Sequence, residues 1–220
     1  TVNNTHVPEV TDVNVTKVWN DGDNQDGIRP GYVVVVLYAN GVKVDMAVLN
    51  SSNSWKYSFK GLPVYKAGEL IKYTVNETAV ANYTVNITDD GKGNFTVNNT
   101  HVPEVTNVTV VKVWIDNDDY DKVRPTSISV QLYANGVKVN ETTLSEDNDW
   151  KDIFKDLPKF KAGELIKYTV NETKVANYTI NITDDGKGNW TVNNTHVPEL
   201  INITVNKVWE DNDDYDKVRP

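Results

Sequence analysis

Apolar and polar residues alternate along most of the chain, and no stretch shows the three-to-four-residue spacing of an amphipathic helix. The alternating runs are rich in β-branched residues, which is typical of strands. Asn40-Gly41 predicts a two-residue hairpin, and Asp90-Gly91-Lys92-Gly93 predicts another turn. In its first half the chain is predicted to form seven strands, at 12–19, 32–39, 42–49, 54–60, 70–78, 82–88 and 94–100. This number of short strands indicates an all-β fold of the β-sandwich type.

The pattern repeats after 95 residues. The string KVW begins at Lys17, Lys112 and Lys207, and three copies of TVNNTHVPE contain Asn4, Asn99 and Asn194. The repeat frame does not start at the first residue. We therefore expect four segments: the last strand of a preceding repeat (1–8), two complete modules (9–103 and 104–198) and the start of a following repeat (199–220).

Strand parity places a few polar side chains on the apolar faces of these strands. In the first module Lys17, Glu77 and Asn99 are predicted to face inward, and in the second module Lys112, Glu172 and Asn194 repeat this arrangement. A single inward lysine commonly reaches the rim of the core, and a single inward glutamate commonly ends a strand at the surface. Three polar groups placed alike in both modules favour mutual contact instead, because an unpaired buried charge costs several kcal/mol. The neighbouring Asn98 and Asn193 have the opposite parity and are predicted to point outward.

Several strings resemble the B-type repeat of collagen adhesin, the CnaB family of surface-protein stalk domains. They are VTKVWNDGDNQDGIRP, YANGVKV, GLPVYKAGELIKYTVNET and FTVNNTHVPE. The resemblance implies tandem prealbumin-like or inverse-immunoglobulin sandwiches. It also implies a self-formed isopeptide bond in each module, Lys17 to Asn99 assisted by Glu77, and Lys112 to Asn194 assisted by Glu172. Each bond forms once, without enzyme turnover or a cofactor. Asn4 and Lys207 lack partners within the chain and are expected to stay unbonded.

The physical chemistry of these residue types is compatible with such a bond. A lysine amine is a nucleophile only when neutral, and an apolar core lowers its pKa. The same core raises the pKa of a carboxyl group, which then holds a proton that it can donate to an amide oxygen. Fixed geometry replaces a bimolecular encounter and gives a large effective molarity.

The composition of the chain limits the classes of binding partner and the cellular locations that we expect. The 220 residues carry a net charge of −9, which argues against nucleic acid and against an anionic membrane surface. The absence of cysteine rules out disulfides and thiolate sites. No apolar run is long enough to span a bilayer, and the first residues do not resemble a signal peptide. We expect an extracellular, cell-surface segment whose anchor and targeting signal lie outside it.

Asn-x-Ser/Thr acceptor motifs occur at sixteen positions. We expect most of their asparagines to point outward, and candidate glycosylation sites are Asn14, Asn82, Asn86, Asn107, Asn177 and Asn181. The alternative is that polar strand faces simply use Asn and Thr, with the duplication doubling the number of motifs.

Two acidic loops, DGDNQDG at 21–27 and DNDDYD at 116–121, raise the question of calcium. Their spacing does not match an EF-hand, so the alternative is a solvated turn paired with Arg29 or Arg124. The three histidines are copies of one linker position and cannot cluster within a module, so no metal site is expected.

These observations favour a structural role, a stalk of crosslinked modules whose immediate partners are neighbouring repeats of the same chain. A host or cell-surface ligand would then bind through other domains. Two alternatives stay open: the modules bind host protein or glycan directly as adhesive domains, or they act as calcium-rigidified spacers.

Overall fold

A computed structural model describes residues 1–220, and it consists almost entirely of β-strands. The first repeat contains β1 (Val10–Asn20), β2 (Tyr32–Ala39), β3 (Val42–Asn50), β4 (Lys56–Pro63), β5 (Tyr65–Lys66), β6 (Glu69–Leu70), β7 (Tyr73–Glu77), β8 (Thr84–Asp89) and β9 (Asn94–Thr100). The predicted all-β sandwich class is confirmed. Each of the seven expected strands is present, joined by the additional two-residue hairpin β5–β6.

Two sheets form the sandwich of the first repeat. One has the strand order β4-β1-β9-β8 and the other the order β3-β2-β7. Alternating inward side chains from both sheets fill the core, with Val15, Val35, Leu37, Leu49 and Val97 completely buried. The predicted hairpin at Asn40-Gly41 joins β2 to β3, and both of its residues have positive φ, as a type I′ turn requires.

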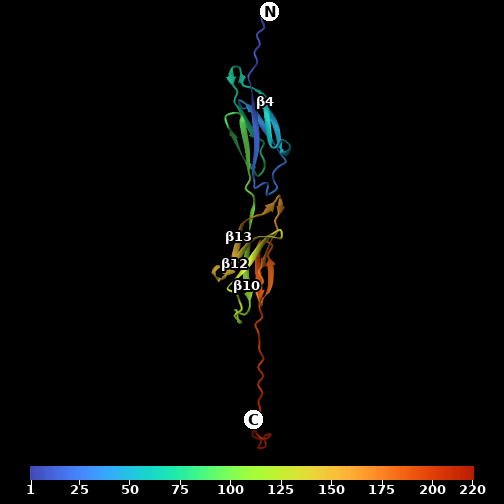
Figure 1. Ribbon diagram of the computed structural model, residues 1–220, viewed down its shortest axis with the longest axis vertical. Coiled ribbons are helices and arrows are strands. Elements are labelled where there is room, and N and C mark those ends of the chain that lie inside the picture. The colour runs from blue at the N-terminus through green and yellow to red at the C-terminus, as the bar shows by residue number, and fades with distance from the viewer. The chain divides into compact units, whose positions relative to one another are not determined.

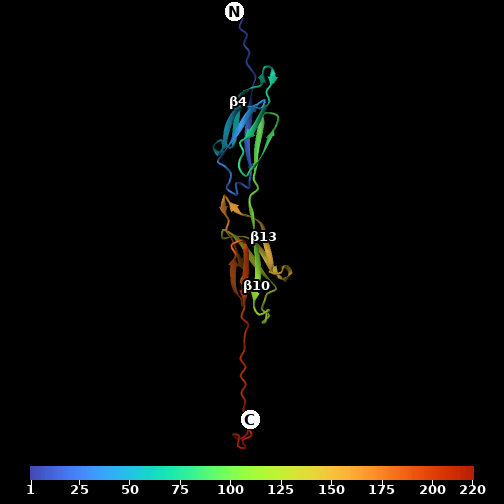
Figure 2. The ribbon, with the colours of Figure 1, turned by 180° about the vertical axis from the view of Figure 1, so that it is seen from behind.

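The first and last strands of the repeat lie next to each other and run parallel (Figures 1 and 2). In this pairing Lys17 is the register partner of Val97, and Trp19 is the register partner of Asn99. A parallel pair needs a long crossover, and here the whole remainder of the repeat serves as that crossover. Residues more than 75 positions apart in sequence therefore become immediate neighbours in the middle of one sheet.

Three strands begin later than predicted, each because the chain turns at residues of positive φ, and β1 begins two residues earlier than predicted, at Val10. The strand expected at 70–78 begins at Tyr73, since Ala67 and Gly68 form the β5–β6 turn before it. The strand expected at 54–60 begins at Lys56, because Ser54 and Trp55 have φ near +54° and +60° and follow a short 3₁₀ helix, η1 (Ser51–Asn53). The strand expected at 82–88 begins at Thr84, after Asn82 with φ of 64°.

The second repeat has the same architecture. Its strands are β10 (Val105–Ile115), β11 (Ser127–Ala134), β12 (Val137–Ser145), β13 (Lys151–Pro158), β14 (Phe160–Lys161), β15 (Glu164–Leu165), β16 (Tyr168–Glu172), β17 (Thr179–Asp184) and β18 (Asn189–Thr195), with the 3₁₀ helix η2 (Glu146–Asn148). The sheets are β13-β10-β18-β17 and β12-β11-β16, and β10 pairs parallel to β18. Neither repeat contains a helix of the length and apolarity needed to cross a bilayer.

Candidate functional site

Three strands of the first repeat deliver one polar side chain each to the same part of the core. Lys17 comes from β1 and Asn99 from β9, both in the four-stranded sheet, and Glu77 comes from β7 in the facing sheet. The three residues are 4%, 0% and 8% exposed, respectively. The structure thus buries all three residues that strand parity had turned inward.

The Lys17 amine has three oxygen neighbours. Its Nζ donates to the carbonyl oxygen of Val18 at 3.2 Å and to that of Val97 at 3.3 Å. Glu77 Oε1 lies 3.5 Å from Nζ, which is longer than a well-formed charge-assisted hydrogen bond. The contact with Val97 holds the amine two residues away from Asn99 on the adjacent strand.

The carboxamide of Asn99 is unsatisfied at both of its polar atoms, and Glu77 Oε1 also lacks a hydrogen-bond partner. Both polar atoms of the carboxamide are buried, and neither Oδ1 nor Nδ2 has a hydrogen-bond partner. Leaving such a group without partners costs about 1–3 kcal/mol for each unmade hydrogen bond. The unpartnered carboxamide thus lies in the core two residues along β9 from Val97, whose carbonyl oxygen accepts the hydrogen bond from Lys17.

Burial sets the electrostatics of the amine. Loss of hydration lowers the pKa of Lys17 to about 8, with the charge of Glu77 acting in the opposite direction. An amine with this pKa is neutral, and so nucleophilic, far more often near neutral pH than a solvent-exposed lysine is.

The second repeat reproduces the cluster. Lys112, Glu172 and Asn194 are 4%, 4% and 0% exposed, and Lys112 Nζ lies 3.6 Å from Glu172 Oε1. Burial lowers the pKa of Lys112 to about 8 and raises the pKa of Glu172. The Asn194 carboxamide also lacks hydrogen-bond partners. Two copies of one arrangement in one chain offer a matched internal control for every experiment on it.

The unpaired copies and the neighbouring asparagines lie elsewhere. Asn4 and Lys207 are exposed and belong to no strand. Asn98 and Asn193 alternate with the buried residues of β9 and β18 and are half-buried on the opposite, outward face, as their parity predicted.

An aromatic ring lies next to the lysine of each repeat. Lys17 Nζ lies over the indole of Trp19, 4.1 Å from the ring centroid, and Lys112 lies 3.9 Å from the centroid of Trp114. Trp19 packs against the core of the first repeat. The contact with the amine was missed, although lysine and tryptophan two residues apart on one strand must share a face.

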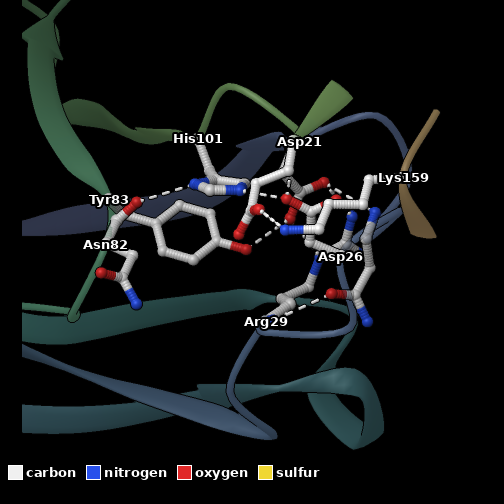
Figure 3. A network of polar contacts seen from close by, with 9 residues as sticks. Asp21, Asp26, Arg29, Asn82, Tyr83, His101 and Lys159 are labelled. Atoms are coloured by element: carbon white, nitrogen blue, oxygen red, sulfur yellow. Dashed lines mark hydrogen bonds and ion pairs between the residues drawn. The ribbon is translucent and has the colours of Figure 1, made fainter. Parts of the chain in front are cut away.

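The first acidic loop is closed by an arginine. Arg29 donates to both carboxylate oxygens of Asp21, through Nε at 2.9 Å and Nη2 at 2.6 Å, and Tyr83 donates to the same carboxylate at 2.8 Å (Figure 3). The hydrogen bond from Arg29 is the main cause that lowers the pKa of Asp21. The expected pairing with Arg29 is confirmed, and Arg124 pairs with Asp116 in the same way. These carboxylates are already neutralised by a cation of the chain itself.

A histidine closes the same end of the first repeat (Figure 3). His101 Nε2 lies 2.8 Å from Asp26 Oδ2, and Nδ1 lies 3.0 Å from the carbonyl oxygen of Asn82. Both partners only accept hydrogen bonds, so both contacts are hydrogen bonds when the ring is protonated and both of its nitrogens donate. The bond to Asp26 is the main cause that raises the pKa of His101.

The glycosylation candidates are surface residues. The side chains of all six lie on exposed positions, namely Asn14, Asn82, Asn86, Asn107, Asn177 and Asn181. Asn14 donates a hydrogen bond to Asn94 on the neighbouring strand, whereas Asn86 lies on the edge strand β8.

A chain built from two such sandwiches, each with a lysine, a glutamate and an asparagine sealed in its core, is a tandem β-sandwich repeat protein. The model of the Cna protein B-type domain matches residues 13–100 and 108–195, so the chain belongs to that family. The resemblance noted in the sequence is thereby confirmed.

Two relatives are similar over the whole chain. A collagen adhesin of Staphylococcus aureus is 40% identical over 222 residues, which cover 100% of this chain and 18% of that protein. The crystal structure of two B repeat units of the collagen binding protein of S. aureus aligns with a TM-score of 0.80 at 40% identity, covering 96% of this chain and 56% of the other. The chain therefore spans about a fifth of the length of its curated relative.

Proposed function

We propose that the chain is a stalk segment of a cell-surface adhesin, in which a self-formed isopeptide bond fastens each complete repeat. The bonds are Lys17 to Asn99, with Glu77 as the proton carrier, and Lys112 to Asn194, with Glu172 as the proton carrier. The single observation that carries this proposal is the buried Asn99 carboxamide without a hydrogen-bond partner, in the same cluster as the Lys17–Glu77 pair. The similarity to collagen adhesin repeats supports the surface location and the stalk role.

The reaction needs only groups that the cluster contains. The lone pair of neutral Nζ forms a bond to Cγ of Asn99, while the Glu77 carboxyl group protonates Oδ1. The Glu77 carboxylate then takes a proton from Nζ and passes it to Nδ2. The Cγ–Nδ2 bond breaks, ammonia leaves, and the proton on Oδ1 returns to Glu77 as the carbonyl re-forms. Glu77 ends in its starting state, and the repeat has lost one molecule of ammonia.

The position of the bond suits a load-bearing element. Tension entering at the start of β1 would reach Lys17, cross to Asn99 on the parallel strand and leave through the end of β9. Residues 18–98 would then carry no load. Without the bond, unfolding would release them to a length of roughly 280 Å at ~3.4 Å per residue. A closed loop of this size also restricts the unfolded chain, which stabilises the fold by about 4 kcal/mol on the model used for disulfides.

The proposal is tested by mapping the bond itself. Proteolysis of the chain followed by peptide mass spectrometry should yield a branched peptide in which Lys17 and Asn99 are joined, and a second one with Lys112 and Asn194. Recovery of the four unbranched peptides in full yield would refute the crosslinks. Binding of the two-repeat chain to host proteins or glycans, measured on an array, would instead support the alternative of direct adhesion.

We also propose that the outward asparagines of the acceptor motifs carry glycans. On a strand such as β8, Asn86 and Thr88 project from the same exposed face, so an acceptor amide and its hydroxyl partner are presented together. Asn86 is also the register partner of Asn98, and two glycans would crowd each other there. Glycopeptide mapping of the protein from its own cells should find Asn86 occupied and Asn98 empty, and bare asparagines throughout would refute the proposal.

A further inference from the structure

The reacting amine of each repeat is in contact with an aromatic face. The distances from Nζ to the ring centroid are 4.1 Å for Lys17 over Trp19 and 3.9 Å for Lys112 over Trp114. Lys207 lies 4.4 Å from the centroid of Trp209, where no sandwich surrounds the pair. The spacing of two residues on an extended chain is thus enough to bring the amine onto the ring.

Trp19 also lies beside the group that the amine attacks. It is the register partner of Asn99 in the parallel pair, and it follows Lys17 by two residues on the same face of β1. Edge-on contacts with Trp55 and Tyr83, at centroid separations of 5.3 Å and 5.0 Å, fix the plane of its ring. The ring therefore touches the nucleophile, borders the electrophile and is held by two aromatic neighbours. The guanidinium of Arg29, which is paired with Asp21, lies 5.5 Å from the centroid of the same ring.

The indole nitrogens of the two tryptophans argue against a role in core packing alone. Nε1 of Trp19 and Nε1 of Trp114 are both buried without a hydrogen-bond acceptor. A residue that only filled space would do so at lower cost as phenylalanine or leucine, which have no N–H group to leave unsatisfied. What tryptophan offers in return is the strongest cation-binding face among the aromatic side chains.

We propose that Trp19 and Trp114 are catalytic groups of the crosslinking reaction, whose indole faces stabilise the positive charge that develops on Nζ as it bonds to the asparagine Cγ. This inference rests on the proposed function. Nζ becomes positive when its lone pair is donated and stays so until the glutamate removes a proton. A ring quadrupole at 4.1 Å acts on that charge inside a site from which water is excluded.

This role has a pH signature that packing does not share. Below the lysine pKa of about 8 the resting amine is itself an ammonium ion, so the ring stabilises the resting state and the intermediate alike and its effect on rate largely cancels. Above that pH the resting amine is neutral, and only the intermediate gains from the ring. Loss of the indole should therefore slow the reaction most on the alkaline side.

The test follows crosslinking during refolding. The 220-residue chain, produced unfolded and unreacted in denaturant, is refolded at a series of pH values from 6 to 9.5, and the loss of ammonia is followed in acid-quenched samples by mass spectrometry. Trp19→Leu should slow bond formation in the first repeat by about tenfold at pH 9, equivalent to about 1.4 kcal/mol, and by much less at pH 6.5. Trp19→Phe, with a weaker quadrupole, should fall between Leu and Trp.

The second repeat of the same molecule is the internal control for the rate of bond formation, because its Trp114 is unchanged. Equal rates in both repeats of Trp19→Leu at every pH, or a slowing of the same size at every pH, would overturn the catalytic role, and the second result would assign Trp19 to packing. If the Leu variant does not fold, the Phe variant decides by the same comparison. Unaltered chains that lose no ammonia at all would refute the proposed function itself, and the inference with it.

Discussion

Lys17 and Glu77 face each other across the core of the first repeat, with Nζ of one residue 3.5 Å from Oε1 of the other. They come from opposite sheets, and both side chains are almost completely shielded from water. A buried ion pair with loose geometry is a poor source of stability, because the desolvation of two charges exceeds their attraction. In the proposed reaction the two groups are instead the nucleophile and the proton carrier that act on the Asn99 carboxamide.

Replacement of the glutamate tests its part as proton carrier. Glu77→Gln retains the volume of the side chain but removes the acid, so the first repeat should form no bond while the second forms its bond as before. The intact mass should then show the loss of one ammonia per chain. Loss of two ammonias from this variant would remove Glu77 from the mechanism, and Glu172→Gln should give the same result in the second repeat.

Removal of the carboxamide tests the mechanical role. Asn99→Ala keeps the Lys17–Glu77 pair but cannot crosslink, so the first repeat should unfold under force and lengthen by roughly 280 Å at ~3.4 Å per residue. The matched control is Asn98→Ala, one residue away on the outward face, which should retain the bond and show no such step. A step of this size in the control or in the unaltered chain would contradict the load path through the crosslink.

The histidine at the end of the first repeat makes stability depend on pH. Because Asp26 raises the pKa of folded His101 above its ordinary value of 6.5, the protonated ring stabilises the fold fully below pH 6.5. This contribution is lost as the pH rises through the raised pKa. The melting temperature should therefore fall on going from pH 6 to pH 8.5.

His196 is arranged alike in the second repeat, so two variants test this dependence. His101→Gln should remove part of the slope of melting temperature against pH, and the double variant His101→Gln, His196→Gln should remove most of it. An unchanged slope in the double variant would show that other groups cause it.

The pair of Asp21 and Arg29 should stabilise the first repeat without calcium. Asp21→Ala leaves the guanidinium and the Tyr83 hydroxyl without their shared acceptor, and we expect a loss of about 2–4 kcal/mol in the free energy of unfolding. Tyr83→Phe removes one hydrogen bond and should cost about 1 kcal/mol. Both are measured by denaturant unfolding, and a chelator added to the unaltered chain should leave its midpoint unchanged. A clear shift with chelator would favour the calcium-rigidified alternative.

The alternation of side chains along strands was sufficient to predict the fold class and the inward residues. Lys17, Glu77 and Asn99 each interrupt an otherwise apolar strand face. Because side chains alternate with a period of two, the apolar neighbours of each residue fix the face on which it lies. The duplication strengthened the prediction that these residues contact one another, because an inward polar residue that recurs at the same place in both repeats needs a common explanation.

Turns and long-range partners were less accessible to sequence reasoning. The start of β7 at Tyr73 depends on Ala67 adopting positive φ, which is uncommon for a residue other than glycine and is not predicted by an alanine in the sequence. The contacts of His101 with Asp26 and of Tyr83 with Asp21 join residues 75 and 62 positions apart, and only the closed sandwich brings them together. The position of Trp19 over the lysine was readable from their spacing, but its chemical meaning depends on the neighbouring asparagine in the parallel strand.

The most direct measurement of the central claim is the intact mass of the unaltered 220-residue chain, determined by high-resolution mass spectrometry after folding. The account predicts a mass below that of the sequence by two ammonias, one for each complete repeat, and not three. A mass equal to that of the sequence, in a chain shown to be folded, would mean that Lys17 and Lys112 remain free amines and would contradict the account.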